Sequence, residues 1–177
     1  TLLGFLTYDY IYKFTSTKQA SDFVEDYQGN TYEGHLYRNN NIAKTAIDPN
    51  YDLAVLYFKP SSNTKIKTIP LATKNPKIND FVISLGSPEG QQNAITYGKI
   101  NKYRKITLKN TPTYLSNVKF DVIDHDAFTL GGSSGGPLLN ENLKIIGIHY
   151  ASDRDTHHFA IPLESIAEFL NKYIYAN

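Results

Sequence analysis

The sequence predicts an all-β protein, with two small antiparallel β-barrels followed by one C-terminal α-helix. Most of the chain consists of short runs of alternating or β-branched residues, separated by Gly, Pro, Asn and Asp. Runs of this kind with turn residues between them are typical of sandwiches and barrels. Tyrosine and phenylalanine also favour strands, and the chain holds 14 Tyr and 9 Phe. The runs expected to form strands are 4–8, 10–15, 31–37, 52–58, 80–85, 94–100, 118–123 and 144–150.

The end of the chain is the one segment with a helical period. Apolar residues recur there at spacings of three and four, which places them in one stripe on a helix. Pro162 suits the first helical turn, where a missing N–H costs nothing. The residues of the stripe are Ile166, Phe169, Leu170, Tyr173 and Ile174.

The 177 residues fit one domain. Within it we expect an N-terminal barrel over 1–73, a second barrel over 74–161 and the helix over 162–177. The polar stretch 74–77 would join the two halves. The expected hairpin 138–140 / 145–150 belongs to the second barrel.

Composition excludes several classes of function. The chain has no cysteine, which rules out a thiol nucleophile, a zinc–thiolate site, an iron–sulfur cluster and a disulfide framework. The formal net charge is +1, without the basic excess of nucleic-acid-binding domains. No apolar run is long enough to span a membrane. We therefore expect no cofactor, no nucleic acid and no membrane span.

Two clusters of residues have side chains of the kinds that bind metals, but neither is expected to hold an ion. One contains Asp121, Asp124, His125 and Asp126, and the other is the pair at 157–158. Neighbouring residues of a strand point to opposite faces, so adjacent side chains rarely converge on one ion. The expected metal content is none.

The string GGSSGGP at 131–137 carries the most chemical information. A flexible Gly/Ser turn is one interpretation, but a linker need not lead directly into Pro and a hairpin. The other interpretation is a nucleophile loop, in which Ser134 projects into a cleft. Glycines allow successive N–H groups to turn to one side, toward a developing oxyanion. The N–H groups of Gly132 and Ser134 would form that oxyanion hole.

Asp52 stands at the mouth of the apolar run LAVL. Alone it is an ordinary turn residue. Together with the serine loop it suggests a carboxylate that orients a catalytic imidazole, because an Asp ahead of the Ser along the chain is one of the known triad orders.

DLAVL at 52–56 together with GSSGGP at 132–137 resembles the trypsin-like serine protease superfamily, with its chymotrypsin fold. Within it the Htr-type proteases, exfoliative toxins and glutamyl endopeptidases of bacteria are most similar. The resemblance runs from about Gly29 to the terminal helix. It implies two barrels with the active-site cleft between them, Ser134 as nucleophile, Asp52 as triad acid, and Gly132 and Ser134 as oxyanion donors.

The resemblance to glutamyl endopeptidases extends to the substrate pocket. IGIHY at 146–150 is similar to their pocket strand, with His149 at the position that reads glutamate, and Thr129 falls on their pocket threonine. Tyr150 and Ala151 continue this substrate-binding strand, although Ala151 departs from the usual glycine. A hydroxyl and an imidazole donate to a carboxylate, which implies cleavage after Glu. A half-buried strand histidine is the alternative for His149.

The general base of the triad is missing from its expected place. His35 is the one histidine before Asp52, only 17 residues upstream and inside the predicted strand 31–37, where we expect a surface residue. Ala20 lies 32 residues upstream, at the separation that the family shows, and follows a Thr three residues earlier. Ala20 is therefore the candidate for a replaced His, natural or engineered. Lys18, as the base of a Ser–Lys dyad, is a weaker alternative.

Three functions remain in competition. The first is a serine endopeptidase that acts on peptide or protein substrates and whose base is replaced in this chain. The second is a natural pseudoprotease that binds peptide or a partner protein without cutting it. The third is a β-rich adhesion module with a chance Gly/Ser turn. The resemblance also implies a secreted or extracytoplasmic bacterial protein.

Overall fold

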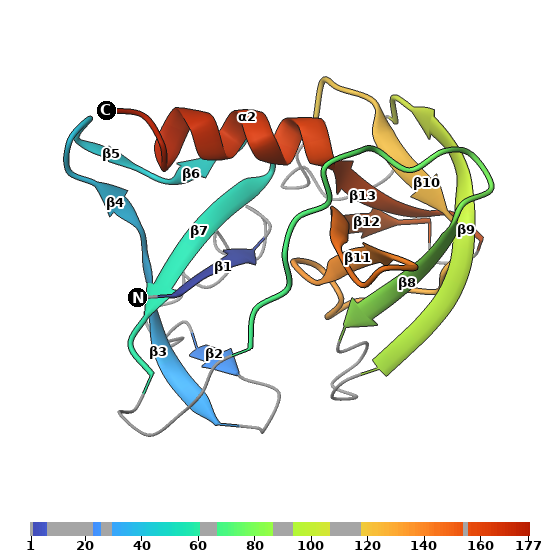
Figure 1. Ribbon diagram of the computed structural model, residues 1–177, viewed down its shortest axis with the longest axis horizontal. Coiled ribbons are helices and arrows are strands. Elements are labelled where there is room, and N and C mark those ends of the chain that lie inside the picture. Colours follow the sequence, from blue (N-terminus) through green and yellow to red (C-terminus); the bar gives the residue numbers. More distant parts are fainter. Residues whose placement is uncertain are drawn as a thin grey trace.

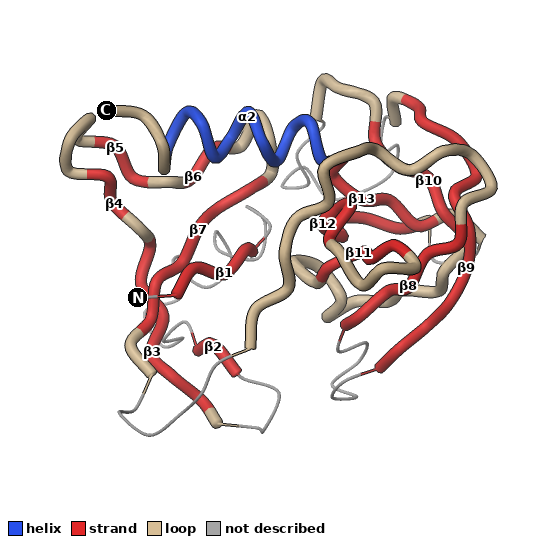
Figure 2. The backbone as a smooth tube through the Cα atoms, viewed as in Figure 1, coloured by secondary structure: helices blue, strands red, loops and turns tan. Residues whose placement is uncertain are grey.

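The computed structural model describes residues 2–6, 23–25, 30–60, 67–86, 94–106, 118–153 and 156–177. The described residues form two β-rich halves, with one helix lying along both (Figure 1). The tube in Figure 2 shows residues 67–80 running from the first half to β8 in the second.

The N-terminal half is an antiparallel sheet in the order β1-β7-β3-β2, with β6 also paired to β7. Its central strand β7 has four consecutive buried residues at 53–56, because both of its faces are covered. A separate hairpin pairs β4 with β5. The strands are β1 Leu2–Leu6, β2 Phe23–Glu25, β3 Thr31–Leu36, β4 Arg38–Asn39, β5 Lys44–Thr45, β6 Ile47–Asp48 and β7 Leu53–Phe58.

The C-terminal half is a closed six-stranded barrel in the order β10-β13-β12-β11-β8-β9. Closure removes the free strand edges that an open sheet exposes. Buried Val82, Ile100, Ile123, Leu138 and Ile146 fill its interior. The strands are β8 Phe81–Gly86, β9 Ala94–Arg104, β10 Val122–His125, β11 Pro137–Asn140, β12 Ile145–Ser152 and β13 His158–Pro162.

Helix α2, Leu163–Tyr173, holds the two halves together. Its buried stripe joins a core that contains Leu53 and Val55 of β7 as well as Ile148 of β12 and Ile161 of β13. At its C-terminal end, Asn39 of β4 donates its side-chain amide to the carbonyl of Ala176 at 3.0 Å. The core and this contact fix the N-terminal sheet against the barrel.

The predicted all-β class, the antiparallel barrel and the terminal helix are confirmed. Two local predictions were wrong, and the strand predicted at 10–15 lies outside the described residues. The strand expected at 118–123 is β10, Val122–His125, because the polar Asp124 and His125 are strand residues buried in the barrel. Pro162 is the helix N-cap with extended ψ of 162° rather than a first-turn residue, because it is the last residue of β13 and is still paired with Gly147 of β12. β13 itself was not predicted.

Candidate active site

The loop 129–136 connects β10 to β11 through two consecutive turns. Ser133 donates its N–H to the carbonyl of Leu130 at 3.0 Å, and Gly136 donates to the carbonyl of Ser133 at 2.9 Å. The end of the loop pairs with β12: Gly135 donates to the carbonyl of His149, and the N–H of His149 donates to Gly136, both at 2.9 Å. Main-chain bonds within the loop and to β12 therefore hold it, and Ser134 is the first central residue of its second turn, 133–136.

Two glycines of the loop adopt backbone angles that other residues rarely take. Gly132 has φ of 104° and Gly135 has φ of 87°, in the region where a Cβ atom clashes with the main chain. Gly136 is required for a different reason, since a Cβ there would lie 2.4 Å from the carbonyl oxygen of Leu85. Each of these three positions therefore needs glycine, two because of their φ angles and Gly136 because there is no space for a side chain.

The two serines of the loop differ in exposure. Ser133 is buried, and its side chain packs so closely on Gly86 that a Cβ there would lie 2.8 Å from the Ser133 hydroxyl. Ser134 is only partly buried, and its hydroxyl bonds to no group in the described part of the chain. Over the same residues, the N–H groups of Gly132 and Ser134 donate to no backbone carbonyl. A half-exposed hydroxyl therefore stands beside two N–H groups without acceptors.

Asp52 ends the turn that leads into β7. It is 1% exposed and has φ of 53°. A positive φ at a residue with a side chain is uncommon and costs on the order of 1 kcal/mol, so it persists where surrounding structure imposes it. Here the pairing of Asp48 with Leu53 across the turn imposes it. The result is a buried carboxylate at the start of the central strand.

Tyr150 faces this carboxylate from the other half of the molecule. The register of β12 with β13 shifts between His149 and Ala151, so a bulge falls at Tyr150, and a bulge re-aims the side chain that it carries. Tyr150 is buried in the core shared by both halves, and its hydroxyl lacks a hydrogen-bond partner among the described residues. Burial, and then the negative charge of Asp52, raise the pKa of this hydroxyl, so it stays protonated.

Thr129 and His149 are both buried beside the serine loop, at 4% and 2% exposure. The Nε2 atom of His149 lies 2.8 Å from the hydroxyl of Ser84 on β8. The hydroxyl of Thr129 lies 2.9 Å from Nδ1 of His158, which also accepts the Thr129 N–H at 3.2 Å. Ala151, the next strand residue after the bulge, is half-buried.

These contacts belong to a cluster of three buried histidines that sequence reasoning missed. The ring of His125 lies 5.2 Å from that of His149 and 5.8 Å from that of His158. His125 and His158 are direct cross-strand partners on β10 and β13. His125 and His158 are far apart in the sequence, so their contact could be predicted only from the strand order of the barrel. The described residues contain no group of three or more side chains suited to a metal ion.

The cluster is neutral. Burial, with the nearby His149 and His158, lowers the pKa of His125 to about 2, and the Ala127 backbone opposes this shift without reaching bonding geometry. Burial and His158 lower the pKa of His149 to about 3. Both rings therefore carry no charge at neutral pH.

The two candidates for a general base, Ala20 and Lys18, lie outside the described residues. His35 is an exposed residue of β3, as predicted, and its ring nitrogen lies 3.8 Å from a carboxylate oxygen of Glu33. Asp52 and the serine loop come from different halves that share one core.

An antiparallel barrel, a glycine-built serine loop and a buried aspartate at the head of a core strand define the class of trypsin-like peptidase folds. The chain belongs to the family of trypsin-like peptidase domains, whose family model matches residues 13–148. It is 32% identical to the mitochondrial serine protease HTRA2 of Bos taurus over 145 residues, which cover 81% of this chain and 29% of that protein. With serine protease HTRA4 of Mus musculus the identity is 33% over 132 residues, 72% of this chain and 26% of that protein.

The chain thus spans less than a third of the length of these relatives. Solved structures show the same fold. The active form of the Rv3671c protease from M. tuberculosis matches with a TM-score of 0.73 and 20% identity, covering 98% of this chain and 70% of that one. Deg5 matches with a TM-score of 0.68 and 23% identity, over 93% and 74% of the two chains. No helix in the described part of the chain is long and apolar enough to cross a membrane.

Proposed function

We propose that this chain is the peptidase domain of a serine endopeptidase, with Ser134 as its nucleophile. The observation that carries the proposal is the loop 129–136, where the half-exposed Ser134 hydroxyl stands beside the free N–H groups of Gly132 and Ser134. Donors fixed in this way stabilise the negative charge that develops on a carbonyl oxygen under attack. Family membership supports peptide or protein substrates.

In the proposed reaction the Ser134 oxygen attacks the carbonyl carbon of the scissile peptide bond. The Gly132 and Ser134 N–H groups then hold the resulting oxyanion. The serine proton must pass to a base and from there to the leaving amine, and Asp52 would orient that base and stabilise its charge. Ala20, the proposed position of the base, carries no imidazole.

The consequence is an enzyme scaffold with impaired chemistry. Binding and an oxyanion hole alone retain about 10³–10⁴-fold catalysis over water in proteases that have lost a triad member. A natural pseudoprotease that binds peptide is the second candidate. It is favoured by the position of His35, the one histidine upstream of Asp52, which is exposed on β3 beside Glu33. We also propose an extracytoplasmic location, although one relative is mitochondrial.

The proposed preference is for a glutamate before the cleaved bond. Thr129 lies in the serine loop itself, and the backbone of His149 bonds to two residues of that loop, which supports a substrate pocket built from these two residues. A substrate carboxylate would compete with Ser84 for Nε2 of His149, and its charge would raise the pKa of the imidazole that it meets. Tyr150 and Ala151 would supply main chain for an extended substrate.

The test restores the base. An Ala20→His variant should cleave a mixed peptide set at least about 100-fold faster than the unmodified chain, with products ending in Glu by mass spectrometry. Adding Ser134→Ala should abolish the gain, and adding Ser133→Ala, at the buried neighbouring serine, should preserve it. If Ala20→His gains nothing, either position 20 is not the place of the base or the chain is a pseudoprotease, and peptide binding by the unmodified chain without any cleavage would favour the pseudoprotease. Equal cleavage after Lys would overturn the Glu preference alone.

A further inference from the structure

The chain contains five histidines, and the structure describes all of them. The buried ring of His125 lies against the rings of His149 and His158 in the barrel. The other four rings each have a nitrogen close to another side chain: His35 to Glu33 at 3.8 Å, His149 to Ser84 at 2.8 Å, His157 to Asp124 at 2.9 Å and His158 to Thr129 at 2.9 Å. Neither Ser134 nor Asp52 takes part in these contacts. The imidazoles of the chain are therefore engaged away from the proposed nucleophile.

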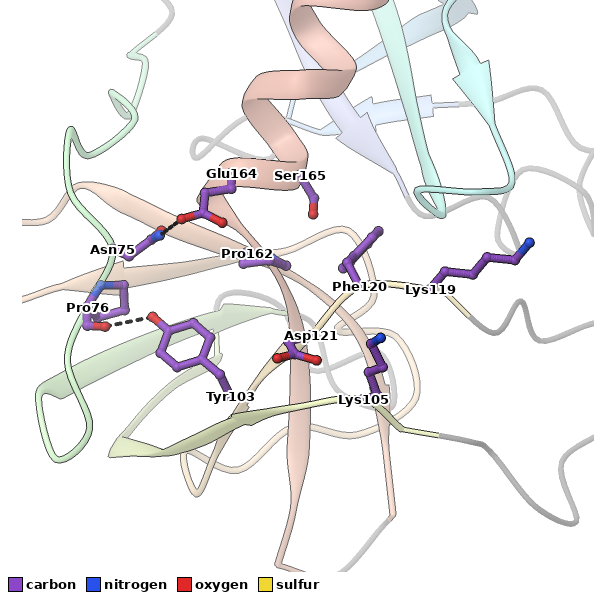
Figure 3. A pocket seen from close by; sticks show the side chains of 10 residues that line it. All are labelled: Asn75, Pro76, Tyr103, Lys105, Lys119, Phe120, Asp121, Pro162, Glu164 and Ser165. Carbon is purple, nitrogen blue, oxygen red and sulfur yellow. Dashed lines mark hydrogen bonds between the residues drawn. The ribbon is translucent and has the colours of Figure 1, made fainter.

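The pocket of about 580 Å³ at the N-terminal end of α2 does not supply a base to Ser134 (Figure 3). Its wall contains two lysines, at 105 and 119, and two carboxylates, at 121 and 164, but no histidine. No residue of the serine loop contributes to this wall. Among the described residues, the proton of Ser134 thus has no acceptor in contact with it.

The Ser134 hydroxyl is open to a group that arrives with the substrate. Its oxygen has no hydrogen-bond partner among the described residues, and it is not one of the buried side-chain atoms in that situation, so a bound molecule can reach it. The φ angles of Gly132 and Gly135 fix the loop and its N–H groups without the help of a base. The nucleophile and the oxyanion donors are in place, and a proton acceptor is what a substrate would have to add.

The direction of the substrate side chains decides where that acceptor can sit. In an extended peptide, neighbouring side chains point to opposite sides. In the proposed pocket, the glutamate before the cleaved bond points into the barrel, toward Thr129 and His149. The side chain one position earlier then points away from the barrel, toward the N-terminal half that carries Asp52. A histidine at this position faces the side of Ser134 on which a triad base belongs.

Asp52 acts on the boundary between the two halves through its charge. Its carboxylate is 1% exposed, yet the charge reaches β12: burial, and then the charge of Asp52, raise the pKa of the Tyr150 hydroxyl. A negative charge that disfavours a phenolate favours a cation in the same place. Asp52 therefore stabilises an imidazole that takes up a proton at this boundary, without having to touch it.

We infer that the unmodified chain cleaves peptides that bring their own base, a histidine directly before the glutamate at the cleaved bond. The inference rests on Ser134 acting as the proposed nucleophile. The substrate imidazole takes the Ser134 proton as the serine oxygen bonds to the carbonyl carbon, and it gives that proton to the leaving amine as the C–N bond breaks. The histidine stays on the acyl part, so it can next take a proton from water that attacks the ester and return one to the Ser134 oxygen.

The test uses three peptides of equal length, acetylated and amidated, with the unmodified chain. The first contains Ala-His-Glu-Ala, the second has Gln in place of His, and the third has His one position earlier, as His-Ala-Glu-Ala. The first should be cleaved after Glu at least about 100-fold faster than the other two, because it alone places a general base beside Ser134. Its rate should rise between about pH 6 and 7.5, as the imidazole loses its proton. Equal rates for the three peptides would overturn the inference.

Variants identify the groups that act on the first peptide. Ser134→Ala should abolish its cleavage, and Ser133→Ala should preserve it. Asp52→Asn should slow it about 10-fold, because the imidazolium loses a nearby negative charge; Asn accepts the positive φ of this position. Asp80→Asn removes the same charge from an exposed turn and should change nothing. Equal losses from Asp52→Asn and Asp80→Asn would contradict the part given to Asp52.

Free imidazole distinguishes this inference from the proposed function. It is added at about 0.1 M to the Gln peptide, where it lacks the positional advantage of a tethered group. Cleavage of the Gln peptide with imidazole, without any preference for the His-Glu peptide in its absence, would keep Ser134 as nucleophile and overturn the substrate-borne base. Binding of all three peptides without cleavage, with or without imidazole, would overturn both and favour the pseudoprotease.

Discussion

Two buried ionisable groups, one in each half of the molecule, show how hydrogen-bond partners decide charge. Asp48 of β6 is 3% exposed and accepts bonds from Lys172 and Tyr173 of α2, each at 2.7 Å, and from Asn50 at 2.9 Å. His125 of the barrel is fully buried, and neither of its ring nitrogens meets a partner among the described residues.

The two groups therefore take opposite states. Burial by itself raises the pKa of Asp48, but the bonds from Lys172, Tyr173 and Asn50 outweigh it and lower the pKa to about 2, so the carboxylate is charged. For His125 the opposing effect of the Ala127 backbone is too small to offset burial, and the ring stays neutral. The N-terminal half is tied to the helix by a satisfied charge, whereas the histidine cluster of the barrel is uncharged. Acid should affect both, beginning at different pH values.

The largest expected effect is loss of stability in mild acid, caused by the histidines. The unfolded chain binds protons near pH 6.5, while folded His125 and His149 bind them only near pH 2 to 3. The unfolded state thus gains protons first, and stability falls as pH drops below 6.5. The slope approaches about 1.4 kcal/mol per pH unit for each histidine below pH 6.5, so the unfolding free energy should fall by about 3 kcal/mol between pH 6.5 and 5. Urea denaturation across this range measures it, and a flat profile would contradict a neutral cluster.

The second prediction concerns the charged contact of the other half. Asp48→Asn should lower the unfolding free energy at pH 7 by about 2–3 kcal/mol, because Lys172 and Tyr173 lose a charged acceptor in a buried position. Asp48→Asn and Tyr173→Phe disrupt the same hydrogen bond. The double variant should therefore lose less unfolding free energy than the sum of the two single losses. Asp80→Asn is the control: this exposed aspartate accepts one turn N–H, from Lys77, and the change should cost less than about 0.5 kcal/mol. Equal losses of unfolding free energy at both positions would contradict a stabilising role for the contacts of Asp48 with Lys172 and Tyr173.

The acid response of Asp48 occupies a lower pH range. Its folded pKa of about 2 lies below the ordinary 3.8, so its contribution is complete above pH 3.8 and disappears as pH falls toward 2. The histidine effect begins more than two pH units higher and continues down to pH 2 to 3. The loss of stability between pH 6.5 and 4 therefore reports on the histidines before Asp48 contributes.

The contrast also explains what the sequence could predict. The strands, the serine loop and Asp52 carry local signals: alternation, turn residues, and glycines whose φ values of 104° and 87° need glycine. The histidine cluster carries none, because His125 and His149 meet only through the strand order of the barrel. β13 was missed for a related reason. Its five residues are all buried, and a short buried run shows no alternation.

Polar residues inside strands were the other source of error. The segment Val122–His125 ends in two polar residues, which suggested that the strand had already finished. In the structure Asp124 is fully buried, and Arg104 at 2.7 Å and His157 at 2.9 Å bond to its carboxylate. These partners lie 20 and 33 residues away. A buried polar residue can be predicted only together with its partners, and the sequence does not show which residues those are.

The smallest expected effect isolates one histidine. His125→Leu keeps a similar volume and removes two nitrogens that have no partner among the described residues, so at pH 7.5 stability should change by less than about 1 kcal/mol. At pH 5 the variant should exceed the unmodified chain by about 2 kcal/mol, since it no longer loses stability to protons taken up by the unfolded state. His35→Leu makes the same change at an exposed position and should leave the pH profile unaltered. If the unfolding free energy of His125→Leu falls with pH as steeply as that of the unmodified chain, buried His125 does not cause the acid sensitivity. The contrast drawn between His125 and Asp48 would then be wrong.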